Sequence, residues 1–307
     1  MVPKVSIIIN CLNPGIFLQE AIDSIYAQTY HNWEIILWDN ASIEDIQSFI
    51  TCYDDRLHYF KAEKTVNLGE ARNLAMSKAK GELIAFLDCD DIWMPEKLSN
   101  SITRFDDLEV GLVYTKWDRF NALGYCQTVS EGVSLPEGWV FKEILFKNFT
   151  CLSTLVFRSD IVHKDKIQFD PQFNYLEDTD FLIKVARKWK FAYVNISLTQ
   201  YRMHSASATA TKVESFRKEM DILIDKFSAI YPEVKEKYAD KLRAANRRDS
   251  AIDNWRKGHR RIARHMIYPI LKISPMNSLI YVAMYFPFKY IDWIRQRLFK
   301  KSSGYYY

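Results

Sequence analysis

Glycine is scarce in this chain, which has nine glycines among 307 residues. Dinucleotide-binding and P-loop proteins hold phosphates with glycine-rich loops, yet the sequence contains neither Gly-x-Gly nor Gly-x-x-x-x-Gly-Lys. This absence argues against both classes of protein. If a nucleotide binds here, a metal ion held by side chains must provide much of the binding of its phosphates.

Cysteine is also too sparse to suggest a covalent framework. The five cysteines are odd in number, and none forms the Cys-x-x-Cys pair that is common in zinc sites. We therefore expect a reducing compartment and no structural zinc. The sequence enters a predicted strand at Val5 without a basic region and a cleavable apolar segment before it. We expect no signal peptide and a cytoplasmic location.

No apolar run approaches the roughly 20 residues that a membrane-spanning helix needs. The run 279–286 stops at Pro287 and Lys289. Positive charge is concentrated around it, because residues 256–301 hold eleven Lys or Arg and one acid, Asp292. The net charge of this segment is +10, whereas that of the whole chain is +4, so the other residues together carry −6. Aromatic residues among these bases favour a peripheral contact with an anionic membrane surface. Packing on the rest of the chain or on a partner subunit would also account for them.

The first hundred residues alternate between strands and helices. Apolar runs predict the strands, helical spacing of apolar residues predicts the segments between them, and Gly81 closes the last of these helices. Repeated β-α units with short loops imply an α/β fold, Rossmann-like, with a mostly parallel sheet flanked by helices. The strands are predicted at 5–9, 33–38, 57–61 and 83–87, and the helices at 16–28, 44–52 and 70–79.

The pattern is less regular after residue 91. From about residue 215 it is helical, with many Lys, Arg and aromatic residues. We therefore expect a catalytic domain at 1–210 and a helical, basic and aromatic C-terminal extension at 211–307. The remaining predicted elements are strands at 110–114, 153–157, 191–195 and 199–202, a hairpin over 116–129, and helices at 137–147 and 177–189.

Three carboxylates follow the predicted strand at 83–87, namely Asp88, Asp90 and Asp91. Five consecutive apolar residues indicate a strand buried on both faces, and open α/β sheets bind ligands at the carboxyl ends of such strands. Clustered carboxylates repel one another unless a cation is present. Oxygen ligands suit Mg²⁺ or Mn²⁺, which in turn suit a diphosphate. The alternative is an acidic, solvated start to the helix that follows Pro95.

A series of short motifs runs in order through residues 5–207. The motifs are Val5-Ser6-Ile7-Ile8-Ile9-Asn10, Ala27-Gln28-Thr29-Tyr30, Asp39-Asn40-Ala41-Ser42, Asn67-Leu68-Gly69-Glu70-Ala71-Arg72-Asn73, Gly81-Glu82, Leu87-Asp88-Cys89-Asp90-Asp91, Trp93-x-Pro95-x-Lys97-Leu98, Glu177-Asp178-x-Asp180 and Tyr201-Arg202-x-His204. Together they resemble the family 2 glycosyltransferases of the GT-A fold. The resemblance implies inverting transfer of a sugar from a nucleotide-diphosphate sugar to a glycan or lipid-linked acceptor, in cell-surface polysaccharide biosynthesis. It implies no nucleic-acid partner.

The resemblance also implies roles on the donor side. Asp90 would bind Mn²⁺ or Mg²⁺, Asp88 would contact the ribose or the ion, and His204 would approach the diphosphate or the ion. Many members have two aspartates where this chain has Asp39-Asn40, so uracil is not assigned as the base. The implied nucleoside and phosphate contacts are Asn10, Leu12, Asp39, Asn40, Asn67 and Arg72.

Asp178 resembles the general base that takes the proton of the acceptor hydroxyl, with Glu177 and Asp180 as alternatives. A carboxylate suffices because the proton moves as the glycosyl bond breaks. Structural roles also account for these residue types. Acids stabilise a helix N-terminus, Arg72 could form a surface ion pair, and a lone histidine such as His204 is usually structural.

Two other functions are compatible with parts of the pattern. A sugar nucleotidyltransferase also uses a Rossmann-like sheet and Mg²⁺, but it would need a glycine-rich, basic loop where this chain has Asn10-Cys11-Leu12-Asn13. A non-catalytic binding protein with this fold would not need Asp88, Asp90 and Asp178 together. The glycosyltransferase remains the leading hypothesis.

Overall fold

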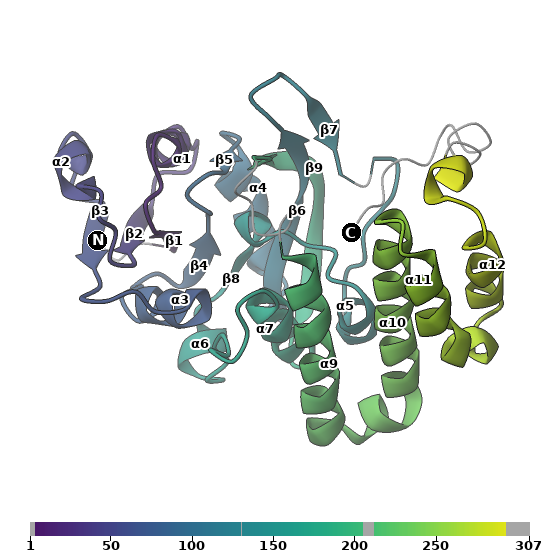
Figure 1. The fold of residues 1–307 in the computed structure, drawn as a ribbon. Coiled ribbons are helices and arrows are strands. Elements are labelled where there is room, and N and C mark those ends of the chain that lie inside the picture. Colours follow the sequence, from purple (N-terminus) through teal and green to yellow (C-terminus); the bar gives the residue numbers. More distant parts are fainter. Residues whose placement is uncertain (1–3, 130, 205–211, 293–307) are drawn as a thin grey trace. The chain divides into compact units, whose positions relative to one another are not determined.

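The structure is a computed structural model that describes residues 4–129, 131–204 and 212–292 (Figure 1). The chain divides between residues 207 and 208 into two compact units. The first unit is built around a sheet, and the described residues of the second are helical. The assignment of catalysis to the first and of an accessory role to the second stays a prediction.

A nine-stranded sheet forms the centre of the first unit. Its strands lie in the order β3-β2-β1-β4-β8-β6-β9-β5, and β7 pairs with β6 beside this series (Figure 1). The strands β3, β2, β1 and β4 are parallel, β8 is antiparallel to β4 and β6, and β9 is parallel to β6. The bounds are β1 Val5–Cys11, β2 Trp33–Asp39, β3 Leu57–Lys61, β4 Leu83–Phe86, β5 Ile92–Trp93, β6 Val110–Phe120, β7 Cys126–Thr128, β8 Val156–Arg158 and β9 Lys190–Arg202.

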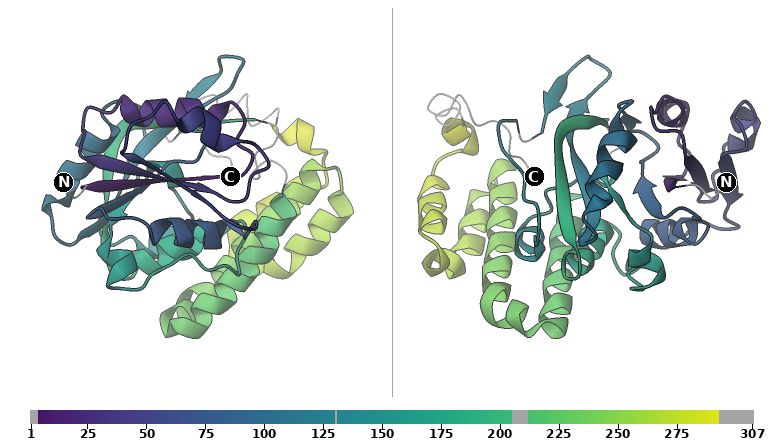
Figure 2. Two further views of the ribbon diagram at one scale, coloured as in Figure 1. Left: turned by 90° about the vertical axis from the view of Figure 1, so that its left-hand side faces the viewer. Right: turned by 180° about the vertical axis from the view of Figure 1, so that it is seen from behind.

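Helices cover both faces of this sheet, which confirms the predicted α/β class. Figure 2 shows α1 on one face and α3 on the other. The α-helices are α1 Phe17–Tyr26, α2 Ile46–Ile50, α3 Leu68–Met76, α4 Lys97–Ile102, α5 Phe141–Phe146, α6 Asp160–His163 and α7 Glu177–Ala186, and the 3₁₀-helices are η1 Thr103–Asp106 and η2 Leu152–Thr154.

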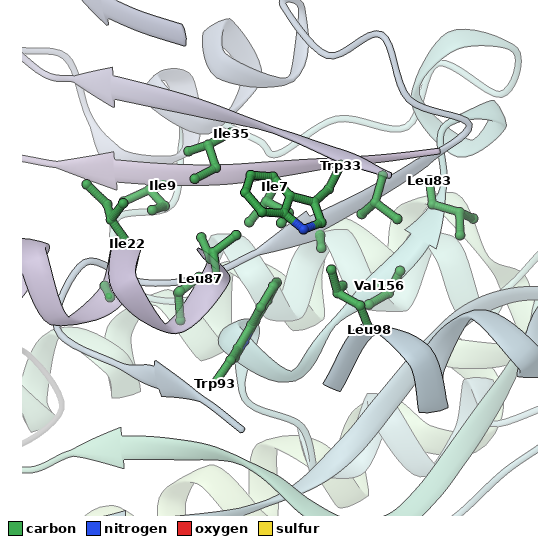
Figure 3. Close-up of a cluster of buried hydrophobic side chains, with 14 of the residues drawn as sticks. Ile7, Ile9, Ile22, Trp33, Ile35, Leu83, Leu87, Trp93, Leu98 and Val156 are labelled. Atoms are coloured by element: carbon green, nitrogen blue, oxygen red, sulfur yellow. The ribbon is translucent and has the colours of Figure 1, made fainter. Parts of the chain in front are cut away.

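The core explains why the middle residues of β1 and β2 are apolar. Ile7 and Ile9 of β1 lie with Ile22 of α1 in one buried cluster (Figure 3). The side chain of Ile8 points to the opposite face, because successive side chains alternate along a strand, and it is also fully buried. A strand buried on both faces has no polar face. Near the carboxyl end of each strand the apolar run gives way to a polar residue, Asn10 in β1 and Asp39 in β2.

The predicted strands are confirmed in the first half of the unit and merge in the second half. The strand predicted at 110–114 and the first arm of the hairpin form one strand, β6, and the two strands predicted at 191–195 and 199–202 form β9. The register of β6 with β9 shifts near Thr115 and Lys116, which breaks the apolar pattern without ending the strands. The strand predicted from residue 153 was wrong at its start, where η2 stands instead.

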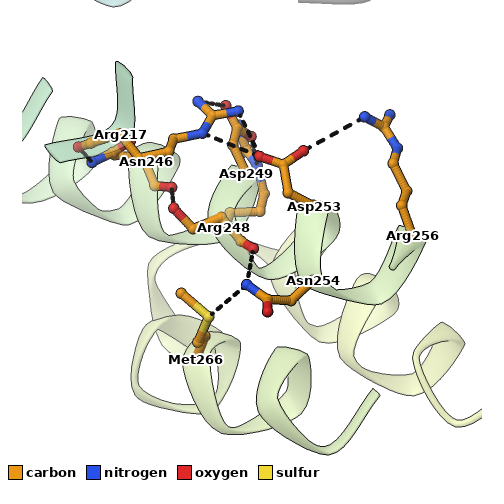
Figure 4. Close-up of polar contacts among 9 residues, drawn as sticks. Arg217, Asn246, Arg248, Asp249, Asp253, Asn254, Arg256 and Met266 are labelled. Atoms are coloured by element: carbon orange, nitrogen blue, oxygen red, sulfur yellow. Dashed lines mark hydrogen bonds and ion pairs between the residues drawn. The ribbon is translucent and has the colours of Figure 1, made fainter. Parts of the chain in front are cut away.

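The second unit has its own small core, in which Trp255 packs with Ile267 and Met284. Polar contacts join its first two long helices, since Arg217 reaches Asp249 and Asp253 (Figure 4). None of the helices in the described ranges is long and apolar enough to cross a membrane. The elements are α9 Val213–Ile230, the π-helix η3 Val234–Tyr238, α10 Ala239–Arg256, α11 Arg260–Ile267, the 3₁₀-helix η4 Tyr268–Ile273 and α12 Pro275–Ala283.

Candidate active site

The carboxyl ends of three parallel strands place the predicted donor residues at one edge of the sheet. Cys11 at the end of β1 is in register with Asp39 at the end of β2, and Asn10 lies one residue earlier. β4 pairs with the other side of β1 and leads into Asp88. Because parallel strands end on the same side, these side chains share one edge.

The acidic loop after β4 carries one buried carboxylate, Asp91, and two partly exposed carboxylates, Asp88 and Asp90. Asp91 is buried and accepts hydrogen bonds from the Ser153 hydroxyl at 2.6 Å and the Arg202 backbone N–H at 3.0 Å. Asp90 Oδ2 lies 2.8 Å from His204 Nε2, and the Asp88 side chain is about one-third exposed. Burial raises the pKa of both Asp88 and Asp91. Asp91 therefore fixes the loop, and Asp88 and Asp90 are the groups available to a ligand.

Arg72 of α3 is buried and connects this loop to helix α7. Its guanidinium forms an ion pair with Glu177 and lies 3.5 Å from Asp88 Oδ1. The alternative of a surface ion pair at Arg72 is therefore wrong. Burial opposes the charged form, but the charges of Glu177, Asp88 and Asp178 outweigh it and raise the pKa of Arg72. Burial raises the pKa of Glu177 to about 7, although Arg72 acts in the opposite direction.

Asp178 lies in the first turn of α7, beside Glu177. Its Oδ2 accepts a hydrogen bond from Asn148 Nδ2 at 3.2 Å, and its Oδ1 accepts one from the Thr179 backbone N–H. Burial raises the pKa of the Asp178 carboxyl, partly offset by Arg72 and by these hydrogen bonds. The carboxylate is thus oriented by two donors and held close enough to Arg72 to interact with it.

Asp180 lies on α7 two residues beyond Asp178. Its carboxylate is fully buried and forms an ion pair with Lys184 at 2.7 Å, one turn further along α7. Two residues along a helix turn the side chain by about 200°, so Asp180 points away from the side of Asp178. The structure therefore places Asp178 and Glu177, but not Asp180, beside Arg72.

Of the predicted nucleoside residues, two are engaged with the backbone. The Asn40 amide donates to the Val66 carbonyl at 2.8 Å and accepts from the Val66 N–H at 3.1 Å. Asn67 caps α3 by accepting from the Glu70 N–H, and its Nδ2 donates to the Pro171 carbonyl. Both side chains therefore shape the loops around the site through hydrogen bonds to the backbone.

The other nucleoside residues are arranged differently. Asp39 is buried and accepts hydrogen bonds from the Tyr59 hydroxyl and the Ser42 N–H, both at 2.7 Å. Burial raises the pKa of Asp39, but these hydrogen bonds and Lys61 outweigh it and lower the pKa overall. Among the residues that the structure describes, both polar atoms of the buried Asn10 amide lack a partner. Such groups are rare, and a ligand that bonds them would remove the cost of their burial. Leu12 is exposed.

Sequence reasoning did not find several residues that build this edge. Ser153 accepts from the Asp88 N–H at 3.0 Å in addition to its bond to Asp91, and Asn148 orients Asp178. Tyr59 supports Asp39 from the neighbouring strand β3. No local sequence pattern predicts these three residues, because each forms its hydrogen bond to a residue at least 20 positions away in the chain.

The donor atoms at the acidic loop are compatible with a hard divalent cation, although they do not form a complete cage. Within the described part of the chain, no three His, Cys, Asp or Glu residues converge as a metal site. Asp90 and His204 provide one carboxylate and one imidazole within 2.8 Å, with Asp88 on the same loop. Oxygen and imidazole ligands suit Mn²⁺, and oxygen ligands suit Mg²⁺. A cation held by these few groups would need further ligands from water or from a bound diphosphate.

Comparison with known proteins agrees with this geometry. The profile of glycosyl transferase family 2 matches residues 6–151. An uncharacterized glycosyltransferase of Methanocaldococcus jannaschii is 31% identical over 216 residues, which cover 66% of this chain and 71% of that protein. The UDP-Glc:alpha-D-GlcNAc-diphosphoundecaprenol beta-1,3-glucosyltransferase WfaP of Escherichia coli is 27% identical over 71% of this chain and 85% of its own length.

Two solved structures share the fold at low sequence identity. TarS of S. aureus in complex with UDP-GlcNAc has a TM-score of 0.64 at 18% identity, covering 79% of this chain and 71% of that chain. A mannosyltransferase of Pyrobaculum calidifontis in complex with GDP-Man and Mn²⁺ has a TM-score of 0.57 at 16% identity, covering 98% and 89%. The sheet, its acidic edge and these sequence relatives lead to one assignment: the chain is a glycosyltransferase that belongs to family 2 and has the GT-A fold.

Proposed function

We propose that this glycosyltransferase moves a sugar, with inversion, from a nucleotide-diphosphate sugar to a glycan or lipid-linked acceptor. The observation that carries the proposal is a network of contacts around buried Arg72. Arg72 joins Asp88, at the sheet edge predicted to bind the donor, to Glu177, the neighbour of Asp178. A carboxylate base thus stands next to the groups that would hold the leaving diphosphate. Single-displacement transfer needs this juxtaposition.

Asp178 is the proposed general base. Asn148 and the Thr179 N–H hold its carboxylate, and its burial raises its pKa, which makes it a better proton acceptor than a solvated aspartate. The acceptor oxygen forms a bond to the anomeric carbon while the bond from that carbon to the diphosphate breaks. The acceptor proton passes to Asp178, and the diphosphate leaves with the bonding electron pair. One displacement inverts the anomeric configuration.

Asp90 and His204, with Asp88, are the residues that would hold Mn²⁺ or Mg²⁺. Such an ion, when bound, neutralises charge that develops on the leaving diphosphate. Arg72 keeps Asp88 in place and adds a buried positive charge beside it. The unpartnered Asn10 amide is the proposed contact for the nucleoside. Asn40 replaces the second aspartate of many family members and is hydrogen-bonded to the Val66 backbone, so the screen described below includes several bases.

The relatives also support the proposed acceptor and location. The Escherichia coli proteins WfaP and WfgD are named as glucosyltransferases that act on GlcNAc-diphosphoundecaprenol, and TuaG of Bacillus subtilis is named as a putative teichuronic acid biosynthesis glycosyltransferase. By analogy we place this enzyme in cell-surface polysaccharide biosynthesis. We further propose a cytoplasmic enzyme that is peripheral at the inner face of the cell membrane, where a lipid-linked acceptor would be accessible.

The test begins with a screen of UDP-, GDP- and TDP-sugars for Mn²⁺-dependent thermal stabilisation and for donor hydrolysis. With the donor identified, Asp178→Asn should lower turnover by about 10² or more and leave donor affinity nearly unchanged. Asp106→Asn, a change of the same kind at an exposed position, is the control. Full turnover in Asp178→Asn would contradict the assignment of the base. Loss of donor affinity in that variant would instead show a structural role.

A further inference from the structure

Helix α12 in the second unit presents an apolar face that the other described residues leave exposed. Met276, Leu279, Val282 and Phe286 are each 54–66% exposed. Their spacing of three, three and four residues puts them on one side of α12 and of the turn that follows it. The opposite side carries the buried Asn277. This exposed surface, Met276, Leu279, Val282 and Phe286, is called the α12 face below.

The helix is held so that this face stays outward. Three side-chain donors from α10 and α11 bind consecutive carbonyls at its C-terminal end: Arg264 binds Met284 O, Arg260 binds Tyr285 O and Trp255 binds Phe286 O, at 3.3, 3.1 and 2.8 Å. These bonds satisfy the carbonyl of Met284, which caps α12, and the carbonyls of the next two residues in the turn that follows. Rotating α12 to bury its apolar face would break them. The exposure of the face is therefore built into the unit.

The charge around the α12 face is positive. Residues 273–288 contain no charged residue, and exposed Lys272 and Lys289 stand at the two ends of this stretch. No acid occurs between Asp253 and Asp292. Asp253 itself already forms ion pairs with Arg217 and Arg256 (Figure 4). Arg260 and Arg264 are used as carbonyl donors, so the flanking lysines are the charges that best fit an external partner.

We propose that the α12 face docks on an anionic lipid membrane, with α12 lying in the plane of the interface. An apolar face flanked by lysines and aromatic residues is the pattern of interfacial helices. An apolar face that binds another protein would not need a lysine at each end. Tyr285 and Tyr290, both more than half exposed, supply the aromatic component. This proposal concerns a surface of the second unit and does not rest on the proposed catalytic residues.

The experiment measures co-sedimentation of the full chain with phosphatidylcholine vesicles with and without phosphatidylglycerol. Leu279→Glu with Val282→Glu should weaken partitioning to the anionic vesicles by about a hundredfold, since each change removes an apolar side chain that docking would bury in the membrane and adds a repelled charge. Leu108→Glu with Leu123→Glu, at two exposed leucines of the first unit, adds the same charge and should change partitioning far less.

A second variant isolates the electrostatic part. Lys272→Gln with Lys289→Gln should lower partitioning about twenty-five-fold at low salt, because each lysine contributes about a fivefold factor, and the difference should shrink at high salt. Donor hydrolysis and circular dichroism should match the wild type in every variant, which separates failure of docking from failure of the fold or of catalysis. Equal sedimentation of wild type and the Leu279/Val282 variant would overturn the proposal. So would a wild-type dimer that this variant converts to monomer without any vesicle binding, since the occupant would then be a second copy.

Discussion

A fully buried lysine, Lys97, leads to a prediction about the pH dependence of stability. Its ammonium donates hydrogen bonds to the Thr154 carbonyl at 2.7 Å and the Ser101 hydroxyl at 3.3 Å, and it lies 5.4 Å from the centre of the Trp93 ring. Burial lowers the pKa of Lys97 from its ordinary value of 10.5 to about 7. The folded protein therefore loses this proton at a much lower pH than the unfolded chain does.

The sign follows from proton counting. Between about pH 7 and about pH 10.5 the unfolded state binds more protons than the folded state, so the free energy of unfolding rises with pH. Below the folded pKa the penalty for charging Lys97 in the interior is fully present. The penalty decreases by about 2 kcal/mol from about pH 7 to about pH 9, and by about 5 kcal/mol over the whole window. Both figures are orders of magnitude.

Urea unfolding of the wild type and of Lys97→Met at about pH 7 and about pH 9 tests this. Desolvation raises the pKa of the half-buried thiols of Cys89 and Cys151, and these thiols remove stability as pH rises through the range where unfolded thiols ionise. Only the difference between variants is therefore informative. That difference should move by about 2 kcal/mol in favour of the wild type as pH rises. Lys64→Met, at an exposed lysine, should show no such change. Parallel pH profiles for wild type and Lys97→Met would refute the reasoning.

Two further substitutions test the donor edge. Asp90→Asn should abolish Mn²⁺-dependent stabilisation by nucleotides while leaving the fold nearly intact, because it relieves repulsion with Asp88 and Asp91; unchanged Mn²⁺-dependent thermal shifts would contradict the metal assignment. Asn40→Asp should lower the free energy of unfolding by about 1–3 kcal/mol at neutral pH, since a carboxylate cannot donate to the Val66 carbonyl and would face it without a partner. Urea unfolding in acid should recover part of this loss, and equal stability of both chains at neutral pH would show that Asn40 does not hold the loop.

The first half of the fold could be predicted because its signals are local. Strands β1 and β2 are buried on both faces, so unbroken apolar runs such as Ile7–Ile9 mark them directly. The second half depends on pairing between distant segments. β6 and β9 remain continuous through irregular register near Thr115 because each is hydrogen-bonded to the other, and this support is not visible in either segment alone.

The candidate site shows the same division. Asp88 and Asp90 could be predicted from their position after an apolar strand, because the topology fixes which end of a parallel sheet binds ligands. The burial of Arg72 and its pairing with Glu177 could not, since the two residues are 105 positions apart. Asn40 occupies a family position expected to contact the base, and its amide also bonds the Val66 backbone, a contact that the motif alone does not predict.

The turn η2, a short element with no predicted role, connects these observations. Ser153 of η2 binds Asp91 and the Asp88 N–H, and its carbonyl accepts the Trp93 indole N–H at 2.7 Å. The next residue, Thr154, accepts from Lys97. Two members of the Trp93-x-Pro95-x-Lys97 motif thus hold the turn that holds the acidic loop. The contacts of this motif therefore explain it by support of the carboxylates rather than by contact with a substrate. Burying the ammonium ion of Lys97 costs folding free energy, but the buried group fixes the edge at which the sugar donor is expected to bind.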